Sequence, residues 1–133
     1  MPELPDILIP KAFIAGEWLD AETRFAVTDP ASGEVLAEVP HLGADATRDA
    51  VAAAEAAWPA WRKRTAKERA NLLRGWYDAI MDHQEALARL MTREQGKPLA
   101  ESRGEVAYGA SFVEFYAEEA KRVNVESVTP HLP

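Results

Sequence analysis

The distribution of proline divides this chain into parts that can and cannot form helices. Five of the nine prolines lie before residue 41 and two lie after residue 129, so the middle of the chain contains only Pro59 and Pro98. Proline lacks a backbone N–H and clashes with the preceding helical turn, which excludes it from most helix interiors. The sequence therefore predicts strands and loops at the two ends and helices between them.

Residues 11–40 have the pattern of an antiparallel β-ribbon of two or three strands. Short apolar runs flank the turn Ala15-Gly16, and alternating apolar residues flank a second turn over Asp29–Gly33. We expect residues 1–10 to form an extended N-terminal arm. A ribbon of this size is marginally stable alone, so it needs a partner surface.

The middle of the chain has the apolar periodicity of several helices. We expect Pro59 to disturb the course of the first helix. Thr65 and Glu68 have the spacing of a capping box, which predicts the start of the second helix. A weaker box over residues 82–85 predicts that the helical pattern restarts there, and Gly96 is a stop signal.

The last predicted helix, which begins near Pro98, is apolar on more than one side. One face consists of Val106, Ala110, Val113, Ala117 and Ala120. Outside that face lie Tyr108, Phe112, Phe115 and Tyr116. A helix of this kind is normally covered on more than one side. We expect that so short a chain cannot do this alone, and that residues 123–133 form a frayed tail.

These elements predict a mainly α fold with an N-terminal antiparallel β-ribbon. The formal net charge of −7 disfavours partners such as nucleic acid or an anionic membrane surface. No apolar run approaches the ~18 residues of a membrane helix. The chain contains no cysteine, which excludes disulfides, thiolate metal sites and a cysteine nucleophile within it and fits a cytoplasmic location.

The individual residues predict no active site. His41, His83 and His131 are far apart in sequence and have no ligand at metal-binding spacing, so we interpret them as surface residues. The basic cluster over residues 62–74 is interpreted as a solvated helix face, and the glutamates of the last helix as its charged side. No glycine-rich phosphate-binding loop is present.

The order of these segments resembles the N-terminal portion of the aldehyde dehydrogenase superfamily, and the chain is similar to it over about residues 11–122. The segments that carry the resemblance are residues 13–18, 28–34, 50–61, 68–73 and 94–101. Residues 94–98, Glu-Gln-Gly-Lys-Pro, followed by residues 110–122, are most similar to the bacterial succinate-semialdehyde dehydrogenases of that family.

The resemblance implies a fragment of the α/β aldehyde dehydrogenase fold. Residues 11–40 would be an oligomerisation element, and residues 41–122 the helical part of the cofactor-binding domain. The parent enzyme would oxidise an aldehyde, in particular succinate semialdehyde, to the acid with NAD or NADP. Its catalytic cysteine, glutamate and asparagine and its cofactor-binding sheet would lie outside this chain. We therefore expect a truncated chain with no catalytic or cofactor-binding residue, no cofactor of its own and no activity alone.

The resemblance also implies two lesser sites. A monovalent cation would be held by main-chain oxygens of Val27 and Thr28 and by Glu94, although Glu94 could equally be an ordinary residue of a last helical turn. Tyr108 and Phe112 would line the substrate tunnel, with core packing as the competing interpretation. Partners would be the rest of an aldehyde dehydrogenase chain or further copies of this chain, giving a homo-oligomer.

A second interpretation stays open. The chain could be a stand-alone helical interaction module derived from the same family. It would then bind a protein partner through Phe112, Phe115 and Tyr116.

Overall fold

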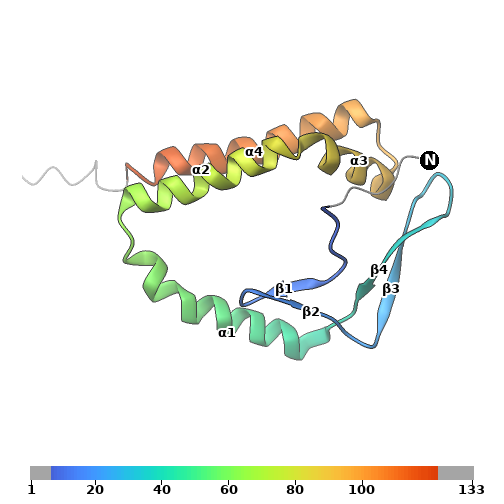
Figure 1. Cartoon of the computed structure of the whole chain (residues 1–133), viewed down its shortest axis with the longest axis horizontal. Helices are drawn as coiled ribbons and strands as arrows, with labels where there is room; N and C mark the ends of the chain where they lie inside the picture. Colours follow the sequence, from blue (N-terminus) through green and yellow to red (C-terminus); the bar gives the residue numbers. More distant parts are fainter. Residues whose placement is uncertain (1–6, 123–133) are drawn as a thin grey trace, which may run out of the picture.

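The computed structural model describes residues 7–122 of the chain. In chain order its elements are β1 (Ala12–Ile14), β2 (Glu17–Leu19), β3 (Arg24–Thr28), β4 (Val35–Pro40), α1 (Gly43–Arg62), α2 (Ala66–Asp82), α3 (Gln84–Gln95) and α4 (Leu99–Glu119). The predicted mainly helical fold with N-terminal strands is confirmed (Figure 1). The frayed tail predicted over residues 123–133 lies outside the described residues, as does most of the predicted N-terminal arm.

The strands form two separate hairpins rather than the single ribbon that the sequence predicted. In the first, β1 pairs with β2 around a turn in which Ala15 has φ +53° and Gly16 has φ +90°. In the second, β3 pairs with β4, and the pairing is interrupted between Val27 and Thr28. The extra residue on β4 at this bulge is Leu36, which is buried.

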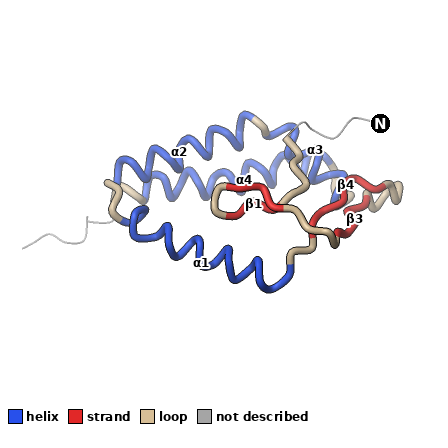
Figure 2. The backbone as a smooth tube through the Cα atoms, turned by 60° about the horizontal axis from the view of Figure 1, so that its bottom comes forward, coloured by secondary structure: helices blue, strands red, loops and turns tan. Residues whose placement is uncertain are grey.

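Helices α2, α3 and α4 pack together and contain most of the buried residues (Figure 2). Small side chains, including Ala70 of α2 and Ala88 of α3, let the helix backbones approach closely. On α4 the buried residues are Ser102, Val106, Ala110 and Ala117. Val106, Ala110 and Ala117 belong to the predicted face, Ser102 extends it at the N-terminal end, and the predicted Val113 and Ala120 are only half-buried.

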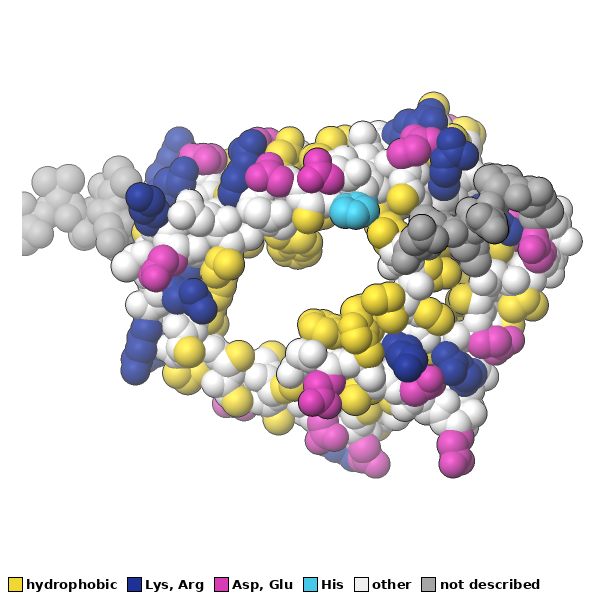
Figure 3. All heavy atoms as spheres, viewed as in Figure 1, with side chains coloured by type: hydrophobic (Ala, Val, Ile, Leu, Met, Phe, Trp, Pro, Cys, Tyr) yellow, Lys and Arg dark blue, Asp and Glu magenta, His cyan; other side chains and the backbone are white. Residues whose placement is uncertain are grey.

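Helix α1 lies apart from this layer. Pro59 sits inside it without interrupting it, so the expected disturbance at Pro59 is not a helix end. None of its residues is buried. Together with the hairpins, α1 forms the other side of an open ring, and Figure 3 shows an opening through the molecule bordered by hydrophobic side chains.

The helix ends follow the sequence signals in two of three places. The Thr65–Glu68 capping box is present in full, with Glu68 N–H donating to the Thr65 hydroxyl and Thr65 N–H donating to the Glu68 carboxylate. Gly96 ends α3 with φ +76°. The box predicted over residues 82–85 does not form: α2 ends at Asp82, and His83, the residue before α3, provides no side-chain cap. None of the described helices is long and apolar enough to cross a membrane.

Candidate functional site

A groove runs between the end of α2, α3 and α4. It has a volume of about 610 Å³, and it is lined by Ile80, Leu87, Leu90, Met91, Glu94, Gln95, Glu105, Val106, Tyr108, Gly109, Ala110 and Phe112. It contains both predicted tunnel residues and one of the predicted cation ligands. Its floor is apolar, and Glu94 and Glu105 are its acidic members.

The aromatic side chains of α4 are exposed. Tyr108 and Phe112 are one turn apart, and their rings meet edge to face with centroids 4.9 Å apart. Phe115 and Tyr116 form a second such pair at 5.3 Å. Between 48% and 66% of each of the four residues is exposed, while the opposite face of α4 is buried. Within the described residues, Tyr108 and Phe112 are therefore exposed rather than packed in a core.

A second groove, of about 510 Å³, lies near the C-terminal end of α4. Its lining residues are Trp61, Arg69, Leu73, Tyr116, Glu119, Ala120 and Arg122. The Nε of Arg69 is buried there without a hydrogen-bond partner in the described structure. Arg69 is therefore partly buried, whereas the basic cluster over residues 62–74 was predicted to be a solvated helix face.

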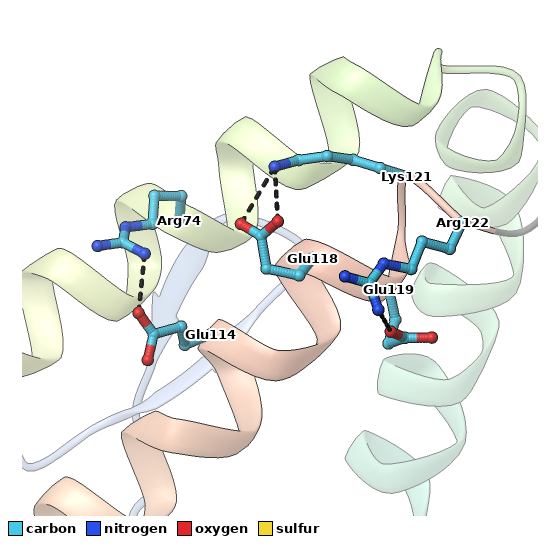
Figure 4. Close-up of polar contacts among 6 residues, drawn as sticks. All are labelled: Arg74, Glu114, Glu118, Glu119, Lys121 and Arg122. Carbon is cyan, nitrogen blue, oxygen red and sulfur yellow. Dashed lines mark hydrogen bonds and ion pairs between the residues drawn. The ribbon is translucent and has the colours of Figure 1, made fainter.

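Other charged residues around this end of α4 are paired on the surface (Figure 4). Arg74 donates to Glu114 at 2.9 Å and so joins α2 to α4. Lys121 donates to both carboxylate oxygens of Glu118, and this hydrogen bonding lowers the pKa of Glu118. These contacts agree with the predicted charged helix face.

The residues predicted to hold a cation lie on two elements that meet. Val27 and Thr28 end β3, which contacts α3, the helix that carries the exposed Glu94. Two backbone oxygens and a carboxylate are the hard donors that suit an alkali cation. Strand pairing is irregular between Val27 and Thr28, where β4 carries the extra residue Leu36.

This junction contains a residue that the sequence analysis did not single out. Arg93, next to Glu94, forms ion pairs with Asp29 and Glu34 of the turn between β3 and β4. Backbone hydrogen bonds from Ala31, followed by other bonds including one from Arg93, lower the pKa of Asp29. These ion pairs could not be predicted from the sequence, because no periodicity connects residue 93 to residues 29 and 34.

The two histidines in the described part of the chain lie in different surroundings. His83 places Nδ1 2.9 Å from the carbonyl oxygen of Ala79, and His41 lies edge-on to the ring of Phe25. His131 lies outside the described residues. Within residues 7–122, no group of three or more His, Cys, Asp or Glu side chains could hold a metal ion.

Comparisons with known proteins give a consistent result. The model of the family described as "Aldehyde dehydrogenase family" matches residues 18–131. The NADP-dependent succinate-semialdehyde dehydrogenase of Escherichia coli is 56% identical over 123 residues, which are 91% of this chain and 26% of that enzyme. Glutarate-semialdehyde dehydrogenase of Pseudomonas putida is 54% identical over 125 residues, with 92% and 26% covered.

Among solved structures, the succinate-semialdehyde dehydrogenase of Burkholderia pseudomallei superposes with a TM-score of 0.86 at 53% identity. The superposition covers 90% of this chain and 25% of that one. The chain thus spans about a quarter of the length of the relatives it matches.

Proposed function

The chain belongs to the aldehyde dehydrogenase family, and from this premise we propose that it serves as the N-terminal part of an NAD(P)-dependent semialdehyde dehydrogenase. The proposal rests on the sequence identity of this chain to two semialdehyde dehydrogenases. The identities are 56% and 54%, and the alignments cover 91% and 92% of this chain. Their names describe substrates with an aldehyde at one end and a carboxylate at the other. We propose the same substrate class here, with succinate semialdehyde first, and a cytoplasmic location.

The proposed role of this segment is structural rather than chemical. The chain has no cysteine, so a cysteine nucleophile of the kind that the resemblance implies must come from another part of the enzyme. We expect the 133-residue chain alone to have no dehydrogenase activity. The remaining part of the enzyme would supply the nucleophile and the binding site for NAD or NADP.

The exposed aromatic residues of α4 support this role. A soluble chain rarely leaves a contiguous apolar surface of more than a few hundred Å² in water. Further parts of the enzyme would cover Phe115 and Tyr116 and would leave Tyr108 and Phe112 along a passage for substrate. The same contacts would bury part of α1, which has no buried residue in this structure.

A chimeric enzyme tests the proposal. This chain replaces the matching segment of the Escherichia coli succinate-semialdehyde dehydrogenase, and reduction of NADP by succinate semialdehyde is measured. We expect an active chimera and an inactive free chain. A folded chimera of native mass without activity would contradict the proposed function, and turnover by the free chain would contradict its structural role. If the chimera fails to assemble while the free chain is folded and monomeric, the results would favour the alternative that this chain is a stand-alone interaction module.

The tunnel assignment has its own test in the same chimera. Phe112→Glu places a carboxylate in the groove, and we expect it to raise the KM for succinate semialdehyde by roughly tenfold or more, because like charges repel. Ser111→Glu is the control, since the exposed Ser111 does not line the groove. Equal effects of the two substitutions on KM would contradict the assignment.

The cation site is tested by stability rather than by activity. If Val27, Thr28 and Glu94 hold a monovalent cation, the free chain should melt at a higher temperature in potassium or sodium chloride than in choline chloride. Glu94→Gln should remove the difference, and Glu101→Gln, at an exposed position in the first turn of α4, should keep it. A wild-type chain that melts alike in all three salts has no such site.

A further inference from the structure

The open ring consists of two limbs with two principal joins between them. The helical limb contains α2, α3 and α4, and the outer limb contains the two hairpins and α1. One join is the chain itself, between α1 and α2. The other is the contact of β3 with α3, the most extensive contact between a strand and a helix in the described structure.

Arg93 lies at the centre of this second join. One of its terminal nitrogens donates to Glu34 at 2.9 Å, and its Nε lies 3.6 Å from a carboxylate oxygen of Asp29. Side-chain exposure is only 14% for Arg93 and 13% for Asp29, whereas Glu34 is half exposed, at 49%. The other ion pairs of the described residues are more exposed, and exposed pairs contribute little to stability. Electrostatic attraction is stronger where water is excluded.

One partner of Arg93, the carboxylate of Asp29, is held in place by its own turn. The other carboxylate oxygen of Asp29 accepts hydrogen bonds from the backbone N–H groups of Ala31 and Ser32, at 2.9 and 3.3 Å. The planar guanidinium therefore meets a carboxylate whose position is already fixed. Next to this pair, Pro30 packs so closely on Gly96 that a Cβ at residue 96 would lie 3.0 Å from it.

We propose that Arg93 is the positioning residue that clamps the β3–β4 hairpin onto α3. It thereby keeps the outer limb joined to the helical limb. Apart from Leu36, the outer limb contributes no buried residue among those described, so apolar packing holds the hairpin weakly. Without Arg93 the hairpin separates from α3, while α2 and α4 keep their own packing. Because Asp29 follows Thr28 and Arg93 precedes Glu94, the clamp also sets the spacing of the proposed cation ligands, and this last part rests on the proposed function.

Hydrogen exchange of the 133-residue chain tests the clamp. Arg93→Met keeps an unbranched side chain of similar length and removes the charge. We expect peptides from residues 24–40 to lose amide protection by about tenfold, because a lone hairpin is marginally stable, while α2 and α4 keep theirs. The control is Arg89→Met on the same helix, where Arg89 pairs with Glu85 at 2.8 Å on the surface. The Arg89→Met substitution should leave the amide protection of residues 24–40 unchanged.

Two further variants sharpen the result. Glu34→Gln weakens the same clamp from the hairpin side without altering a helix, and it should reduce protection of residues 24–40 in the same peptides. Arg93→Lys keeps the charge and should retain part of the protection. Wild-type exchange in Arg93→Met would overturn the proposal, and so would an equal loss of protection in α2 and α4, which would mean that Arg93 stabilises the whole chain.

The absence of cysteine provides an independent measurement. Cysteines introduced at Glu22 of the outer limb and Asn71 of α2, both exposed, allow two spin labels to be attached at known positions. Dilution of the labelled chain with unlabelled chain suppresses the contribution from pairs of labels on different molecules. The distance distribution should broaden in Arg93→Met and remain narrow in Arg89→Met. Equal distributions in the two variants would overturn the clamp.

Discussion

The hydroxyl oxygens of Thr92 and Ser102 lie 2.8 Å apart, across the contact of α3 with α4. Ser102 is fully buried. Ser102→Ala leaves the Thr92 hydroxyl without this partner, and we expect it to lower the free energy of unfolding by about 1–3 kcal/mol. Ser111→Ala is the matched control on the same helix, because Ser111 is exposed. Urea unfolding of both variants checks the prediction, and similar losses would contradict it.

The capping box at the start of α2 gives a second prediction. The Thr65 hydroxyl accepts from Glu68 N–H, so Thr65→Ala should lower the free energy of unfolding by roughly 1 kcal/mol. Thr47→Ala removes a hydroxyl that only donates to the carbonyl of Gly43 within α1, where alanine is the better helix former. Thermal unfolding should therefore separate the two variants. Equal melting temperatures would contradict a contribution from the cap.

The carboxylate of Glu85 couples α3 to α4 in a pH-dependent way. Hydrogen bonds from Arg103, at 2.7 and 3.0 Å, lower the pKa of Glu85 in the folded chain. Because the folded-state pKa is the lower one, this contribution to stability is present above the ordinary glutamate pKa of about 4.3. It is lost as the pH falls through the folded-state pKa. Glu85→Gln should therefore flatten the acid side of the stability profile, and a profile parallel to wild type would contradict this.

The free chain should self-associate through α4. Each aromatic side chain buries ~150–250 Å² when covered, and four of them lie together on this helix. Sedimentation equilibrium at micromolar concentration should show a dimer or larger oligomer, and the double variant Phe112→Glu/Phe115→Glu should be monomeric. Trp76→Glu is the control, since Trp76 of α2 is as exposed as Phe115, at 58% against 57%. A monomeric wild type would refute the prediction. An oligomer that survives the double variant would place the contact on the hairpins.

Local signals predicted the features whose physics is local. Thr65 and Glu68 are three residues apart, and the left-handed conformation of Gly96 follows from its lack of a side chain. The two apolar sides of α4 follow from helical spacing alone. The prediction of a capping box over residues 82–85 was wrong: Asp82 is the last residue of α2, and His83, which precedes α3, provides no side-chain cap.

Features that depend on contacts between residues distant in sequence could not be predicted from such local signals. Pro59 is accommodated inside α1 because it costs one ladder bond in a helix that is otherwise rich in alanine. Nothing in the pattern of residues 11–40 separates one ribbon from two hairpins, since that difference depends on how the two turns are oriented. The pairing of Arg93 with Glu34 joins residues 59 positions apart, and it follows from the tertiary fold.

The lack of any buried residue in α1 has a consequence for how the chain melts. Cooperative unfolding requires that one element lose contacts when another unfolds. Helix α1 has 20 residues, many of them alanine, so it can retain helical structure largely on its own propensity. Its helix–coil transition should therefore be broad and largely independent of the α2–α4 layer, and the heat capacity trace of the free chain should contain a shallow component beside the main peak.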